Sequence, residues 1–109
     1  MKIDIRSKGL PQDRAARDRI RRRLRFAVGR FADRVERVSI SLEDTNGAKG
    51  GVDKRCRIRL TLLEGGEPLV AEDTDEEIFV AIDRASKRIG RSVARRLKRS
   101  RRTRSQRVS

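Results

Sequence analysis

The side chains of this sequence that are best suited to chemistry are cations at helical spacing near the C-terminus. Read at about 100° per residue, residues 74–102 predict a helix with a narrow apolar side and a basic side. The apolar side holds Ile78, Ile82, Ala85, Ile89 and Val93, and the basic side holds Arg84, Lys87, Arg91, Arg95 and Lys98. Solvated faces usually mix both signs, but residues 84–109 carry twelve Lys or Arg and no Asp or Glu. This pattern predicts a polyanionic partner, most often nucleic acid.

The composition favours phosphate binding over catalysis. The 109 residues have a formal net charge of +14, and only six of the 30 cationic residues are Lys. Arg makes planar, bidentate contacts with phosphate, whereas Lys acts as a point charge. The chain has no His for acid–base chemistry and no Trp or Tyr, so its three Phe offer little for stacking on single-stranded bases. We therefore expect a binding protein and not an enzyme, with no cofactor and no small-molecule substrate.

The acidic run at residues 72–77 has two interpretations. A carboxylate cluster can hold a metal or act as a general acid, but no nucleophile or base accompanies this one. Thr74 and Glu77 instead have the spacing of a capping box, and acids suit the positive end of a helix dipole. We expect these acids to start the long helix and to hold no metal.

Two other motifs carry little chemistry. The single Cys56 excludes an internal disulfide and a multi-Cys zinc site, and its place in an alternating apolar pattern predicts a buried, inert thiol. Residues 47–50 have the GxxG spelling of a KH loop, but that loop joins two helices and this one would lie between strands. We take the match as accidental. Residues 44–53 form a connection longer than a plain hairpin needs, which can carry contacts.

Hydrophobic periodicity in the rest of the chain predicts four strands and a second helix. Alternation places strands at residues 2–6, 37–42, 54–63 and 69–72, with the inward face of the last one not assigned. Apolar residues at i+3 and i+4 predict a helix from near Pro11 to near Ala32. Its apolar positions are Ala16, Ile20, Leu24, Ala27 and Phe31, and Arg14, Arg21, Arg22 and Arg25 lie on its other side.

The order β-α-β-β-β-α predicts an α+β fold. Each strand has one apolar face, so both helices should cover the same face of a four-stranded mixed sheet whose first two strands are parallel. The open face would carry either a second cationic surface or ordinary solvent-facing arginines paired with Glu36, Glu43 or Glu72. The arginines concerned are Arg37, Arg55, Arg57 and Arg59.

We expect one domain over residues 1–99, followed by a basic disordered tail at residues 100–109. The apolar runs are too short for a signal sequence or a membrane span. The expected compartment is the cytoplasm, with no membrane partner.

Three stretches give the chain a resemblance to a known family. They are residues 31–35 (Phe-Ala-Asp-Arg-Val), residues 46–56, and residues 81–83 (Ala-Ile-Asp) at the opening of the basic helix. In order and spacing they resemble the bacterial ribosome hibernation factors, the group of hibernation promoting factor and ribosome-associated inhibitor A (protein Y), also called the sigma-factor modulation family. The likeness covers residues 1–99 and agrees with the predicted order of elements. Members of the family carry bases where this chain has Arg88, Arg91 and Arg95.

The resemblance implies binding to the small ribosomal subunit and its rRNA, in the mRNA and tRNA channel near the decoding centre, which silences idle ribosomes under stress. The likeness is to the short form, without the C-terminal dimerisation domain. It leaves open whether the chain acts on single ribosomes or, with a small helper protein, promotes ribosome dimers. Two other classes stay open: a general double-stranded RNA-binding module, and a protein-binding regulator of a sigma factor, which would need an exposed apolar patch. The residues expected to contact RNA are Arg22, Arg25, Lys54, Arg55, Arg84, Lys87, Arg88, Arg91, Arg95 and Lys98.

Overall fold

The structure has the predicted order of elements and the predicted α+β class. The computed structural model describes residues 1–10, 13–45 and 54–108, and side chains as far as residue 99. The elements are β1 (Lys2–Lys8), α1 (Arg14–Val28), the 3-10 helix η1 (Gly29–Phe31), β2 (Val35–Asp44), β3 (Lys54–Leu62), β4 (Leu69–Asp75) and α2 (Ile78–Val108).

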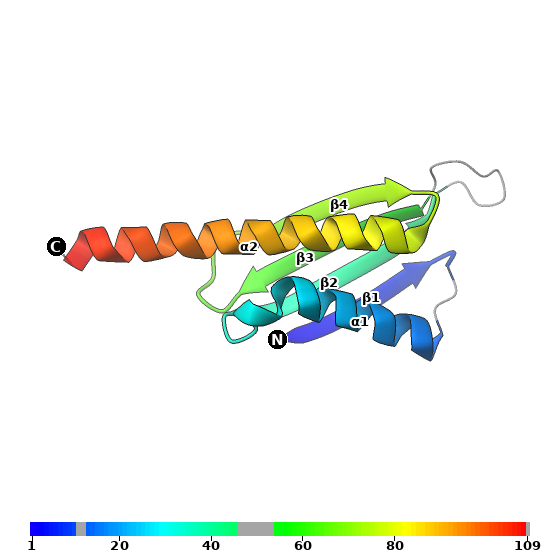
Figure 1. The fold of residues 1–109 in the computed structure, drawn as a ribbon, viewed down its shortest axis with the longest axis horizontal. Helices are drawn as coiled ribbons and strands as arrows, with labels where there is room; N and C mark the ends of the chain where they lie inside the picture. The colour runs from blue at the N-terminus through cyan, green and yellow to red at the C-terminus, as the bar shows by residue number, and fades with distance from the viewer. Residues whose placement is uncertain (11–12, 46–53, 109) are drawn as a thin grey trace.

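The four strands form one mixed sheet in the order β1-β2-β3-β4. β1 is parallel to β2, and the other two pairs are antiparallel. Both helices lie on the same face of this sheet (Figure 1), and no described element covers the other face. The predicted parallel pair and the one-sided layer of helices are therefore confirmed.

Side-chain alternation decides which strand residues enter the core. Val38 of β2 lies opposite Leu60 of β3, Ile40 lies opposite Ile58, and all four side chains are fully buried. Each such aliphatic side chain stabilises the fold by about 1.5–3 kcal/mol through its removal from water. The helices complete the core with Ile20, Leu24, Val28, Ile82, Ala85, Ile89 and Val93, which are also fully buried. The predicted apolar stripe of α2 is confirmed, although Ile78 at its start is only partly buried.

A second buried line on α2 was not predicted. Ala81, Ser86 and Gly90 are buried because α1 packs beside α2. A Cβ atom on Gly90 would lie 2.7 Å from the carbonyl oxygen of Ala27, so any larger residue would push the two helices apart. The apolar stripe of one helix does not reveal which neighbouring helix will pack at its flank.

α1 begins directly after Asp13, which caps it. The Oδ1 atom of Asp13 accepts a hydrogen bond from the backbone N–H of Ala16 at 2.8 Å, which satisfies one of the free N–H groups of the first turn. The predicted start near Pro11 lies outside the described residues. The helix ends at Val28, and η1 then carries the chain to the predicted end near Ala32.

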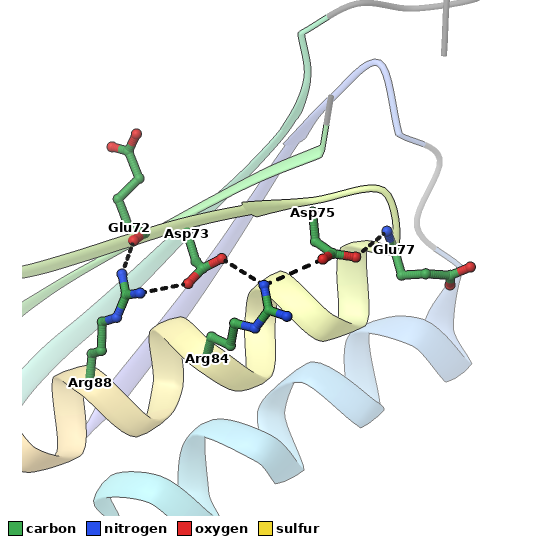
Figure 2. A network of polar contacts seen from close by, with 6 residues as sticks. All are labelled: Glu72, Asp73, Asp75, Glu77, Arg84 and Arg88. Carbon is green, nitrogen blue, oxygen red and sulfur yellow. Dashed lines mark hydrogen bonds and ion pairs between the residues drawn. The ribbon is translucent and has the colours of Figure 1, made fainter. Parts of the chain in front are cut away.

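The predicted capping box of α2 is wrong. Thr74 belongs to β4, where it lies opposite Arg55 of β3, so its backbone is committed to the sheet and α2 begins only at Ile78. A carboxylate oxygen of Asp75 instead accepts a hydrogen bond from the backbone N–H of Glu77 at 2.8 Å (Figure 2). β4 therefore continues past its predicted end at residue 72, because β3 offers backbone partners as far as Lys54.

α2 has 31 residues and projects beyond the end of the sheet (Figure 1). At about 1.5 Å per residue its length is about 46 Å. No Gly or Pro follows Gly90, so the sequence contains no strong helix breaker there. The backbone is helical to Val108, past the predicted helix end near residue 102. The division between a domain and a tail at residue 99 stays a prediction.

Candidate nucleic-acid interface

Carboxylates of β4 balance the first arginines of α2. The guanidinium of Arg88 lies 3.0 Å from the Oδ2 atom of Asp73 and donates a hydrogen bond to the carbonyl oxygen of Glu72 at 2.6 Å. Arg84 lies between Asp73 and Asp75, at 3.6 and 3.4 Å from their oxygens (Figure 2). The side chain of Asp73 is only 7% exposed, so its charge needs these partners. Arg84 and Arg88 therefore hold α2 against β4, and the carboxylates of Asp73 and Asp75 largely balance their charge.

The later cations of α2 lie on its solvent side. Lys87, Arg91, Arg95 and Lys98 are exposed, and none of them forms an ion pair with a residue that the structure describes. Arg95 donates only a long hydrogen bond, at 3.4 Å, to the hydroxyl of Ser92. From residue 87 to residue 98 the helix advances about 16 Å. Over that length, α2 presents unbalanced positive charge that phosphate groups can neutralise.

α1 adds cations to the same layer. Arg22 and Arg25 are exposed and have no ion pair within the described part of the chain. The neighbouring Arg23 pairs with Asp83 of α2, and this pair helps to hold the helices side by side (Figure 1). The exposed cations of both helices therefore share one layer. We call this set the helical basic surface, and it consists of Arg22, Arg25, Lys87, Arg91, Arg95 and Lys98.

Lys54 and Arg55 do not join the helical basic surface. The Nζ atom of Lys54 lies 3.2 Å from a carboxylate oxygen of Asp44, at the start of β3. Arg55 pairs with Glu43 and, at 4.0 Å, with Glu72. Arg55 alternates with buried Cys56, so it stands on the sheet face that is opposite to the helices. RNA that lies on the helices is separated from Arg55 by the thickness of the sheet.

The open face of the sheet combines the two predicted alternatives. Arg37 pairs with Asp4 at 3.4 Å, a partner that was not predicted, while Arg55 is paired as described above. Arg57 and Arg59 are exposed and form no ion pair with a described residue. Arg37, Arg57 and Arg59 border a shallow hollow, so the open face is a second and smaller cationic surface. The hollow is lined by Arg6, Arg37, Ser39, Ser41, Arg57, Arg59 and Thr61.

An exposed aromatic side chain on α1 was not predicted. Phe26 is 94% exposed and borders a groove between α1 and α2. The sequence did contain a sign of this exposure. Phe26 comes two residues after Leu24 and so falls outside the apolar stripe, whose members recur at i+3 and i+4. Side chains that line the groove with Phe26 include Arg23, Arg30, Ser86, Lys87 and Arg91.

Cys56 is buried, as predicted. Its burial, with further contributions from the charges of Asp73 and then Glu72, raises the pKa of the Cys56 thiol to about 12. Such a thiol stays protonated and unreactive near neutral pH. Within residues 1–10, 13–45 and 54–108, no group of three or more His, Cys, Asp or Glu side chains is placed to hold a metal ion. The described helices include none with the length and apolar character needed to cross a bilayer.

Comparison with known proteins gives a family match and two similar structures. Residues 3–101 match the model of the family described as Sigma 54 modulation protein / S30EA ribosomal protein. The crystal structure of the Thermus thermophilus Protein Y N-terminal domain is similar, with 28% sequence identity and a TM-score of 0.70, over 87% of this chain and 98% of that chain. A ribosomal subunit interface protein from Coxiella burnetii shares the fold, with 14% identity and a TM-score of 0.71, over 90% of this chain and 99% of that chain. No curated protein sequence matches this chain.

Proposed function

Because the chain belongs to the Sigma 54 modulation protein / S30EA ribosomal protein family, we propose that it binds the small ribosomal subunit. Its contacts would be with rRNA in the mRNA and tRNA channel near the decoding centre. Occupancy of that channel would block translation by idle ribosomes under stress. On this proposal the protein acts in the cytoplasm by binding, and it carries out no catalytic step.

The helical basic surface is the observation that carries this proposal. Its cations are exposed and lack carboxylate partners in the described structure, so bound phosphates would meet no internal competitor. Each cation that neutralises a phosphate releases condensed counterions, which is the main source of affinity for RNA of any sequence. The carboxylates of β4 lie at the start of α2, so the charge distribution also favours one orientation of approach.

Two of the three basic positions that the family resemblance suggests have exposed side chains and no ion pair with a described residue, which supports a role in binding. The resemblance implies bases at Arg91 and Arg95, and both residues belong to the helical basic surface. The third position, Arg88, contacts Asp73 and the backbone of Glu72. We therefore assign rRNA contacts to Arg91 and Arg95, and we assign to Arg88 the role of holding α2 on the sheet.

Sedimentation with purified small subunits tests this function. If six to ten phosphates are neutralised, we expect the affinity to fall by roughly 10³- to 10⁵-fold between 50 and 200 mM salt. Bound protein should also compete with initiator tRNA for the subunit. Equal affinity for free duplex RNA would support the alternative of a general double-stranded RNA-binding module. A flat salt response would contradict the electrostatic basis of the proposal.

A matched pair of variants locates the contact surface. The double variant Arg91→Ala/Arg95→Ala removes two cations from the helices, and Arg57→Ala/Arg59→Ala removes the same charge from the open face of the sheet. We expect the first to reduce the salt slope by about two units and the second to leave it nearly unchanged. The reverse result would place the rRNA on the sheet.

A further inference from the structure

We propose that the groove between α1 and α2 binds an unpaired RNA base stacked on the ring of Phe26. This inference rests on the proposed function, because it states which part of an RNA the helical basic surface takes. The nucleotide would belong to a single-stranded or bulged segment, since a base inside a duplex offers no free face. The groove would thus distinguish irregular RNA from a continuous duplex.

Phe26 differs from the other two Phe in this chain. The ring of Phe79 lies under the guanidinium of Arg19, 3.9 Å from ring centre to Cζ, and Phe31 lies under Arg30 at 4.6 Å. Both of those rings also pack against the core. Phe26 is 94% exposed and has no cation over its ring among the described residues. Its faces are therefore available to an aromatic ligand.

The charge around Phe26 favours RNA over a protein partner. Arg22 lies four residues before Phe26 and Arg30 lies four residues after it, so both are about one helical turn away from Phe26 along the chain. Lys87 and Arg91 line the groove from α2. These cations give the groove a net positive charge, which attracts a polyanion, and binding of single strands combines a positive groove with aromatic stacking.

The floor of the groove supports the same assignment. Among the described residues, Asp83 is the one carboxylate that lines the groove, and it is paired with Arg23, so it does not repel a phosphate strongly. Ser86 also lines the groove, and its buried hydroxyl has no hydrogen-bond partner in the described structure. An unsatisfied buried hydroxyl is unfavourable. A base edge is rich in hydrogen-bonding groups and would satisfy this hydroxyl once it entered the groove.

Fluorescence gives a direct test because the chain contains no Trp. In Phe26→Trp, the single indole would report stacking at this position. We expect quenching by a single-stranded RNA of about eight nucleotides and no quenching by inorganic polyphosphate, which carries the charge without bases. A duplex RNA should bind through its phosphates and leave the fluorescence almost unchanged. Equal responses to single-stranded RNA and polyphosphate would overturn the inference.

Affinity measurements separate stacking from ordinary apolar contact. Phe26→Ala should weaken binding to the single strand and to small subunits by about 5- to 100-fold, with an unchanged salt slope because no charge is removed. Phe26→Leu keeps an apolar side chain without a ring face and should lose nearly as much, while Phe26→Trp should retain full affinity. The folded state should be unaffected, since the side chain is almost fully exposed.

The possible outcomes distinguish this inference from the proposed function. Small-subunit binding that is the same in wild type, Phe26→Ala and Phe26→Leu would refute stacking and leave the proposed function intact. Full affinity in Phe26→Leu with a loss in Phe26→Ala would indicate ordinary apolar contact in place of stacking and would also refute the inference. If wild type binds the single-stranded RNA with quenching in Phe26→Trp but does not bind small subunits, the base site stands and the proposed ribosomal function fails.

Discussion

Along α2, two groups of cations have the same chemistry and opposite surroundings. The proximal cations, Arg84 and Arg88, lie next to the carboxylates of Asp73 and Asp75 on β4. The distal cations, Arg91, Arg95 and Lys98, face solvent and have no carboxylate partner in the described structure. β4 ends near the start of α2, and this is why only the proximal cations meet its acids. Whether the charge of an arginine on this helix is balanced therefore depends on its neighbours on β4 and not on its place in the basic stripe.

The largest expected effect concerns the apolar stripe on which both groups of cations depend. Ile82→Asp would place a carboxylate at a fully buried position and should reduce the free energy of unfolding by several kcal/mol. Small domains have only about 5–15 kcal/mol in total, so we expect an unfolded or barely folded protein by circular dichroism. Lys87→Asp introduces the same residue at an exposed position of the same helix and should melt cooperatively near the wild-type temperature. A wild-type melt for Ile82→Asp would show that α2 does not use this face.

The second prediction removes the distal cations. Arg91→Ala/Arg95→Ala/Lys98→Ala should weaken small-subunit binding by about 100-fold near 0.15 M salt and reduce the salt slope by about three units. The free energy of unfolding should change by less than about 1 kcal/mol, because Ala has the highest helix propensity and only solvated charge is lost. Binding over a salt series, together with thermal melts, measures both quantities. Wild-type affinity in this variant would mean that the distal cations do not contact the RNA.

The third prediction removes the proximal cations. Arg84→Ala/Arg88→Ala leaves Asp73, which is 7% exposed, without its partners and should cost about 1–3 kcal/mol of stability. The salt slope of binding should stay close to that of wild type. Denaturant unfolding and the same binding series provide the comparison with the distal variant.

Asp73→Asn tests the same contrast between proximal and distal cations by changing the acid and not the arginines. It removes the carboxylate that Arg84 and Arg88 share, which leaves Arg88 without an ion pair in the described structure while Arg84 keeps Asp75, so stability should fall while RNA affinity and salt slope rise. Lower stability without any gain in RNA affinity would show that Arg88 cannot reach phosphate even without its carboxylate partner.

The smallest expected effect involves Cys56, whose thiol pKa depends on burial and also on Asp73 and Glu72. The pKa of its thiol is raised to about 12, chiefly by burial and then by Asp73 and Glu72, from an ordinary value of 9.0. Above pH 9 the unfolded chain loses this proton while the folded protein keeps it, so stability should fall as the pH rises from 9 towards 12, by at most about 1.4 kcal/mol per pH unit. Cys56→Ala should lack this component in a series of unfolding measurements between pH 8 and 10.5. Identical slopes for the two proteins would show that the thiol does not titrate differently in the folded state.

Most of the fold could be predicted because periodicity is a local property. The alternation of Ile58, Leu60 and Leu62 and the helical spacing of Ile82, Ile89 and Val93 each depend on a few consecutive turns or residues, and the structure confirms both. The capping box failed because Thr74 has two suitable uses, as a helix cap and as a strand residue. Backbone pairing with Arg55 of β3 decided between them, and that partner lies outside any local window.

The candidate site also has one property that local sequence predicts, the exposure of its cations, and one that it does not, the pairing of cations on α2 with acids on β4. Exposure of Arg22, Arg25, Lys87, Arg91, Arg95 and Lys98 follows from their helical phase, and the structure places all six on solvent-facing helix surface. Their contact with RNA stays a proposal. Pairing of Arg55 with Glu43 or Glu72 was one of the predicted alternatives, and the structure confirms it. Pairing of Arg84 and Arg88 with Asp73 could not be predicted, because the acid lies on β4 and the arginines lie on α2.

By itself, the sequence determined the α+β class, the apolar faces, the excess of positive charge and the family resemblance, since these depend on residue type and local spacing. The tertiary structure alone decided which charges stay unbalanced. Packing of α2 on β4 pairs Arg88 with Asp73, and packing of α1 beside α2 at Gly90 creates the groove that Phe26 borders. Electrostatic balance and concave shape depend on distances between segments far apart in the chain. Residue spacing along one element cannot specify those distances.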